Sequence, residues 1–136
     1  MIPERYTCDG EDHSPPLAIS AVPHDAKSLV LIFDDPDAPK GTWLHWLLYD
    51  LPPTTSLIVE SPRMERLGGK SGINTWGRTG YGGPCPPDGV HTYCFRLYAL
   101  DYVMGLPDGA NRAQVEEAMA GHIVDEALLQ GTYVRP

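Results

Sequence analysis

Residues 29–50 read LVLIFDDPDAPKGTWLHWLLYD and combine two apolar runs with an acidic, proline-containing turn. The first run, Leu29–Phe33, is short and β-branched, which predicts a buried strand. The second run, Trp43–Tyr49, is largely apolar on both alternating faces and predicts a central strand. We expect one face of that strand to carry Trp43, His45, Leu47 and Tyr49, and the other face to carry Leu44, Trp46 and Leu48.

The turn between the two runs carries three carboxylates. Pro36 and Pro39 fix φ and remove two backbone donors, so the aspartates lie on a stiff turn instead of a strand or helix. His45 follows near the same end of the next strand. An imidazole beside a rigid carboxylate is the functional hypothesis. The alternative is that the Asp-Pro turn is an ordinary turn without a functional role and that His45 is a histidine packed in the core.

The composition bounds the fold. The chain has 136 residues, of which 42% are hydrophobic and 21% charged, which predicts a single domain over residues 1–136. Its 14 glycines and 14 prolines favour turns and short strands over long helices. We therefore expect a mostly β fold.

The net charge limits the classes of binding partner that we expect. A net charge of −8 and a pI near 4.9 exclude a nucleic-acid partner and disfavour acidic membranes. A small anion in a pocket remains compatible with that charge, because local donors decide such binding. No apolar run reaches the ~18 residues of a membrane span and no signal peptide is visible, so we expect a cytoplasmic protein without integral membrane association.

The cysteines give little indication of cross-linking. Cys8, Cys85 and Cys94 are odd in number and lack CxxC spacing. They are therefore predicted to be free thiols.

A second informative stretch, residues 81–93, reads YGGPCPPDGVHTY. Its prolines and glycines predict a loop of nearly fixed shape that opens into a strand over residues 91–100. His91 and Tyr93 share one face of that strand. The glycine-rich residues 62–80 match neither GxGxxG nor GxxxxGK[ST] and predict a surface loop.

The C-terminal part of the chain predicts a capped helix. Asn111 and Gln114 form a capping-box pattern. The helix is expected to bury a stripe and to stop at Gly131, with residues 132–134 returning as a strand. That stripe contains Val115, Met119, His122 and Ile123.

Three motifs together closely resemble the phosphatidylethanolamine-binding protein family: DPDAP at 35–39, Trp-x-His at 43–45 and GPCPPDGVHTY at 83–93. The likeness is closer to its short prokaryotic branch, described as Raf-kinase-inhibitor-like, and it extends to the opening and closing segments. The resemblance implies a Greek-key β-sandwich with a C-terminal helix and a few short helical segments, a cis Ala38–Pro39 peptide, and an anion pocket at the rim of the large sheet. The implied pocket residues are Asp35, Asp37, Trp43, His45, Gly83, Pro84, Cys85, Pro86, His91 and Tyr93.

The sequence departs from the family pattern at two places, and these departures limit which family properties we expect in this protein. The family usually has a further β segment before residue 2, so a sheet edge is expected to be exposed or covered by a partner, which suggests a homodimer. Thr92 stands where eukaryotic members carry Arg. The kinase-regulating role of those members is therefore not transferred.

The expected ligand is a small anion: phosphate, a phospho-headgroup or a carboxylate. The imidazoles of His45 and His91, the Tyr93 hydroxyl, loop N–H groups and the Trp43 ring would bind it, without a cofactor. A carboxylate is expected to accept from one His45 nitrogen and raise the pKa of the ring, so that the other nitrogen donates. A regulatory or inhibitory role would act through the pocket rim.

Three alternatives stay open. The first is an enzyme with a His45/Asp35 acid–base pair, although no G-x-S-x-G elbow is present and Cys85 is the only thiol expected near the pocket. The second is a zinc or iron site built from His45, His91 and two aspartates. The third is a vestigial pocket in an inhibitor or scaffold that acts through its surface. The resemblance favours binding over catalysis.

Overall fold

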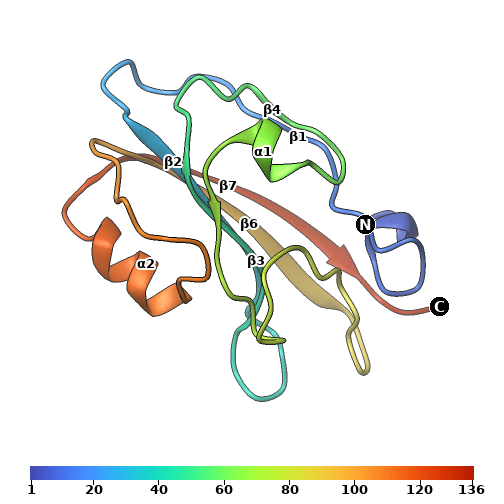
Figure 1. The fold of residues 1–136 in the computed structure, drawn as a ribbon. Coiled ribbons are helices and arrows are strands. Elements are labelled where there is room, and N and C mark those ends of the chain that lie inside the picture. The colour runs from blue at the N-terminus through green and yellow to red at the C-terminus, as the bar shows by residue number, and fades with distance from the viewer.

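The apolar runs form the centre of a five-stranded antiparallel sheet in the computed structural model, which describes residues 1–136 (Figure 1). The strand order is β5-β3-β2-β6-β7, and a separate two-stranded sheet pairs β1 with β4. The strands are β1 (Leu17–Ala18), β2 (Ser28–Asp35), β3 (Trp43–Leu51), β4 (Leu57–Ile58), β5 (Lys70–Ser71), β6 (His91–Leu100) and β7 (Ile123–Tyr133). The helices are the 3₁₀ turn η1 (Glu4–Tyr6), α1 (Met64–Leu67) and α2 (Arg112–Met119). The predicted mostly β fold is confirmed.

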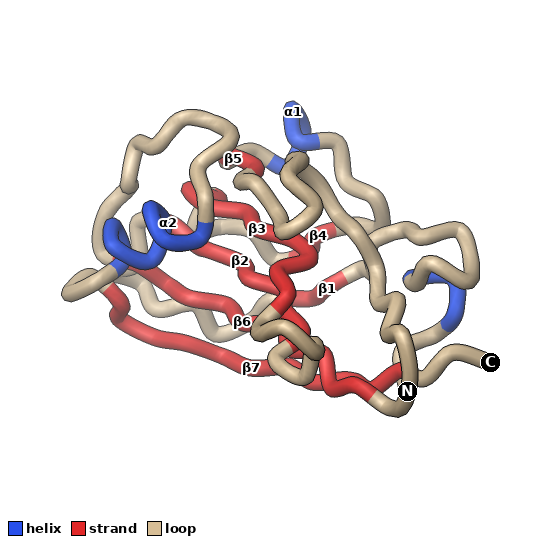
Figure 2. The backbone as a smooth tube through the Cα atoms, turned by 90° about the horizontal axis from the view of Figure 1, so that it is seen from below, coloured by secondary structure: helices blue, strands red, loops and turns tan.

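The two faces of the large sheet bury separate cores. Alternate residues of β2 contribute Leu29, Leu31 and Phe33 to one core, where the small sheet adds Ile58. The intervening Val30 and Ile32 point to the other face, which α2 covers (Figure 2). The period-2 alternation of a strand produces this division. None of the helices has the length and apolar character needed to cross a membrane.

The predicted faces of β3 are wrong beyond His45. Phe33 pairs with Trp46 but Asp34 pairs with Leu44, so between these two pairs β3 carries one extra residue, a β-bulge at His45. The bulge turns His45 to the side of Phe33, whose ring centroid lies 5.3 Å from the imidazole. Leu47 and Tyr49 belong to the opposite core, on the α2 side.

The C-terminal helix is shorter than predicted. Its Asn111–Gln114 capping box is present, but α2 ends at Met119. Gly121, at φ +81°, then reverses the chain into β7, so Ile123 begins a strand and His122 is half-buried beside Asp101. The expected stripe is therefore limited to Val115 and Met119, and Gly131 lies inside β7 instead of ending the helix.

The termini and the loops lie at defined places on this framework. Ile2 N donates to the Thr132 carbonyl at 2.7 Å, so the two termini lie side by side (Figure 1). β5 and β7 form the edges of the large sheet. The homodimer suggested by an exposed edge stays a prediction. The loops after β2 and before β6 meet at one end of the sheet, where the candidate site lies.

Candidate ligand pocket

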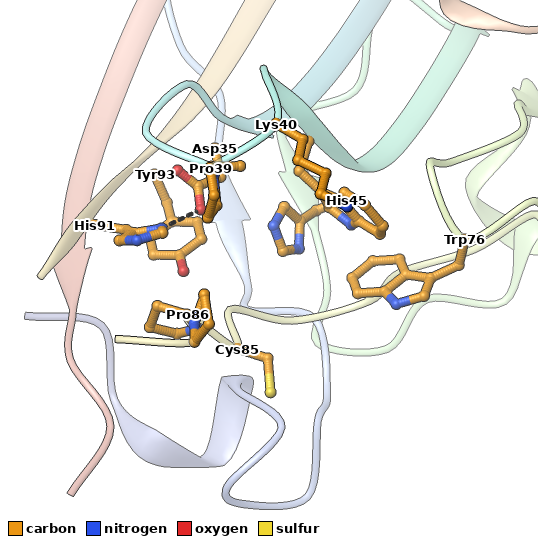
Figure 3. A pocket seen from close by; sticks show the side chains of 12 residues that line it. Asp35, Pro39, Lys40, His45, Trp76, Cys85, Pro86, His91 and Tyr93 are labelled. Carbon is orange, nitrogen blue, oxygen red and sulfur yellow. Dashed lines mark hydrogen bonds and ion pairs between the residues drawn. The ribbon is translucent and has the colours of Figure 1, made fainter. Parts of the chain in front are cut away.

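A cavity of about 370 Å³ opens where β2 ends and β3 and β6 begin (Figure 3). Three strands supply its floor and two loops its walls, so residues far apart in the sequence converge there. Its lining consists of Asp35, Ala38, Pro39, Lys40, Trp43, His45, Trp76, Cys85, Pro86, Pro87, His91 and Tyr93. Seven of the ten predicted pocket residues are in this set.

The other three predicted residues support the wall from behind. Asp37 Oδ2 accepts from Thr92 N at 2.8 Å and ties the Asp-Pro turn to the start of β6. Gly83 N donates to Asp12 Oδ1 at 2.9 Å, and the Pro84 carbonyl accepts from Cys8 N at 3.1 Å. These contacts hold the two loops in place without facing the cavity.

Asp35 pairs with His91 and not with His45, which corrects the predicted pair. His91 Nδ1 lies 2.6 Å from Asp35 Oδ2, and both side chains are less than a tenth exposed. Asp35 Oδ1 accepts from Asp37 N at 2.8 Å. Both carboxylate oxygens are thus occupied, and the carboxylate fixes the orientation of the His91 ring.

His45 is held by the backbone instead. Its Nδ1 donates to the Gly82 carbonyl at 2.7 Å, and its ring lies among the rings of Phe33, Trp76 and Tyr93. Burial lowers the pKa of His45 below its ordinary value of 6.5, outweighing the Gly82 carbonyl and the nearby charge of Asp35, which favour the charged ring. The prediction of a raised pKa is therefore wrong, because the carboxylate lies beside the other imidazole.

Two buried donors in the pocket have no hydrogen-bond partner: Trp43 Nε1 and the Tyr93 hydroxyl. The Tyr93 hydroxyl points into the cavity between His91 and Pro86 (Figure 3). Burial, with the negative charge of Asp35, raises the pKa of Tyr93, so this group stays a protonated donor. Buried polar groups in native proteins nearly always find a partner. Two residues that line the cavity thus each carry a buried donor without an acceptor in the protein.

A disulfide closes one wall, so the prediction of three free thiols is wrong for two of them. Cys8 and Cys85 are bonded, with Cα atoms 5.5 Å apart, and only Cys94 is free and buried. The odd number of cysteines gave no indication of this disulfide, whose two cysteines are 77 residues apart in the sequence. The bond anchors the N-terminal segment against the loop that carries Pro86, and it leaves Cys85 without a nucleophilic thiolate.

The sequence did not indicate Lys40, Trp76 or the lining role of Pro39 and Pro87. Lys40 is exposed at the rim, forms no ion pair, and extends over the cavity near His45 (Figure 3). Trp76 comes from the glycine-rich loop, where no periodicity marks it. A lone aromatic in such a loop was the available signal. The Ala38–Pro39 peptide is trans, so the expected cis bond is absent.

Neither chemical alternative gains support from this geometry. No group of three or more His, Cys, Asp or Glu side chains could hold a metal ion. The Asp35–His91 pair resembles a base with its orienting carboxylate, but no hydroxyl or thiol nucleophile is hydrogen-bonded to His91.

Comparison with known proteins places the whole chain in one group. Residues 1–134 match the family model described as phosphatidylethanolamine-binding protein. A UPF0098 protein of Methanothermobacter thermautotrophicus is 54% identical over 98% of this chain and 91% of its own length. The crystal structure of a phosphatidylethanolamine-binding protein homologue from Chlamydia trachomatis superposes with a TM-score of 0.94, at 46% identity over 99% of this chain and 90% of that one. Escherichia coli YbcL, described as a member of the mammalian family, gives a TM-score of 0.84 at 29% identity, over 95% of this chain and 84% of that one.

Proposed function

Since the chain belongs to the phosphatidylethanolamine-binding protein family, we propose that its pocket binds a small oxyanion, namely phosphate or a phosphate ester. The observation that carries this proposal is the pair of buried, unpartnered donors, Trp43 Nε1 and the Tyr93 hydroxyl, in one cavity. An anionic oxygen would accept from both. Hydrogen bonds to charged groups contribute about 1.5–3 kcal/mol each, more than neutral ones.

The local charges suit an anion despite the net charge of −8. Lys40 is the only Lys or Arg in the lining and has no carboxylate partner. The one lining carboxylate, Asp35, is occupied by the Asp37 amide and His91. The positive potential at the rim therefore comes from a free lysine, and both oxygens of the carboxylate below it already accept a hydrogen bond.

The size and walls of the cavity suit a small ligand with an organic part. Pockets for small molecules measure about 300–1,000 Å³ and are mostly apolar. Here Pro39, Pro86, Pro87 and the indoles of Trp43 and Trp76 supply the apolar wall. A phosphate ester with a short organic group fits this chemistry. A regulatory role acting through the rim stays a prediction.

The test is a thermal-shift and calorimetric titration with inorganic phosphate, phosphoethanolamine and acetate. A ligand at a hundredfold excess over its Kd should stabilise the fold by about 2.7 kcal/mol. Tyr93→Phe keeps the ring but removes one donor, so phosphate affinity should fall by roughly tenfold or more. Tyr98→Phe, a half-buried tyrosine on the opposite face of β6, is the matched control. No stabilisation by any of these anions, or equal binding by Tyr93→Phe, would contradict the proposal.

A further inference from the structure

His45 presents an acceptor, not a donor, to the pocket. A carbonyl oxygen can only accept, so the 2.7 Å contact with Gly82 places the ring proton on Nδ1. In a neutral imidazole the other nitrogen, Nε2, then carries a lone pair. The ring edge that carries Nε2 is the one left to line the cavity, since the Nδ1 edge is engaged by the loop behind it.

The surroundings keep this ring neutral. His45 is 3% exposed, and its ring is packed against Phe33, Tyr93 and Trp76. The charges of Asp34, Asp35 and Asp12 favour the imidazolium, but burial outweighs them. The other titratable groups at the cavity, His91 and Lys40, make no hydrogen bond with the His45 ring.

The pocket therefore offers donors and one acceptor together. Trp43 Nε1 and the Tyr93 hydroxyl seek acceptor oxygens, whereas His45 Nε2 seeks a hydrogen. Each oxygen of Asp35 already accepts one hydrogen bond, from Asp37 N and from His91 Nδ1. Figure 3 shows the His45 ring and the Tyr93 hydroxyl directed into the same space.

We propose that His45 makes the pocket selective for oxyacids that still carry a proton, such as hydrogen phosphate, over fully deprotonated anions of the same shape, such as sulfate. This inference rests on the proposed function and names its ligand class. Two oxygens of hydrogen phosphate accept from Trp43 and Tyr93 while its P–O–H donates to His45 Nε2. Sulfate has only acceptor oxygens, so it places a lone pair against Nε2 and leaves that nitrogen without a donor. A site built to hydrogen-bond a donor discriminates strongly against an analogue that lacks it.

The experiment compares the two anions by calorimetry at pH 8 and equal ionic strength, where both are tetrahedral dianions. We expect phosphate to bind at least about tenfold tighter than sulfate. His45→Gln places an amide near Nε2 that can rotate to donate, so the two affinities should come within about threefold of each other. His24→Gln is the control, because it changes an exposed histidine outside the cavity and should leave both affinities and the selectivity in place.

The outcomes separate this inference from the proposal on which it rests. Equal binding of phosphate and sulfate by the wild type overturns the selectivity and leaves oxyanion binding intact. Binding of neither anion overturns both. If His45→Gln does not fold, nitrogen NMR of ¹⁵N-histidine in the wild type decides the matter. The inference requires an unprotonated His45 Nε2 with and without phosphate, and a protonated Nε2 in the complex overturns it.

Discussion

Asp34 and Asp35 are neighbours at the end of β2, yet they belong to two different regions of the molecule. Asp34 points toward α2, where Arg96 Nε and Arg112 Nη1 lie 3.1 and 2.8 Å from its Oδ2. Asp35 points into the pocket, where its partner is His91. Both aspartates are almost fully buried, at 1% and 4% exposure. Burial alone therefore does not distinguish a structural carboxylate from one in a binding site.

The partner makes the distinction. Two guanidinium groups are always charged and compensate Asp34 permanently. An imidazole can exchange protons, and it leaves its second nitrogen for other contacts. On the pocket side, two residues that line the cavity carry unpartnered donors, Trp43 Nε1 and the Tyr93 hydroxyl. The α2 side has no comparable cavity. We infer that Asp34 stabilises the fold and that Asp35 prepares the site.

The largest effect is expected on the structural side. Replacing both Arg96 and Arg112 with Met leaves the Asp34 charge buried and unpaired, which should lower the free energy of unfolding by roughly 3–5 kcal/mol in denaturant titrations. Phosphate affinity of the folded protein should not change. Arg66→Met, an exposed arginine without an ion pair, should stay within about 0.5 kcal/mol of the wild type. A large loss of phosphate affinity in the double variant would contradict the separation of a structural region around Asp34 from a binding region around Asp35.

The next effect concerns the pocket wall. Reducing the Cys8–Cys85 bond, or replacing both residues with Ser, releases a loop of 77 residues and should cost roughly 2–4 kcal/mol of stability. Phosphate affinity should also fall, because the wall that carries Pro86 loses its anchor. Adding reductant to the double-Ser variant should have no further effect. An unchanged thermal midpoint of the wild type in reductant would contradict the cross-link.

A matched pair of variants then tests the two aspartates directly. Asp35→Asn should weaken phosphate binding by about tenfold, because His91 loses the charge that orients it, at a stability cost of about 1–2 kcal/mol. Asp34→Asn should lower stability with phosphate affinity unchanged. Calorimetry and denaturant titration on both variants check this. Equal affinity losses in the two would contradict the division of roles.

The smallest effect is a pH dependence from His45. Its pKa is lower in the folded protein than in the unfolded chain, so the unfolded chain binds more protons between the two values. Stability is therefore full above pH 6.5 and falls as the pH drops below it toward the folded pKa. Thermal midpoints at pH 7.5 and 5.5 should show a smaller loss for His45→Gln than for the wild type. An equal loss would mean that His45 does not contribute.

Sequence patterns predicted the parts of the molecule that regular strand geometry determines. The alternation of β6 placed His91 and Tyr93 on one face, and the structure confirms it. Patterns could not predict the bulge at His45, because one extra residue in a ladder leaves no local signature. For the same reason the alternation did not reveal that His45 and Leu47 face opposite cores.

Sequence patterns also did not predict the contacts between residues that are far apart in the chain. Asp35 precedes His45 by ten residues, but its partner is His91, brought close by the pairing of β2 with β6. The Cys8–Cys85 bond and the position of Trp76 likewise depend on how loops pack. Proximity in the sequence favoured the wrong imidazole, and only the sheet order identifies the correct one.

The most direct test of the central claim is the indole N–H spectrum of ¹⁵N-tryptophan-labelled protein during a phosphate titration. Trp43 Nε1–H has no partner in the cavity, whereas Trp46 lies outside the cavity and serves as an internal reference. We predict that the Trp43 signal shifts in a saturable manner while the Trp46 signal stays in place. A Trp43 signal that does not move at saturating phosphate, or three tryptophan signals that drift together without saturation, would contradict oxyanion binding in this pocket.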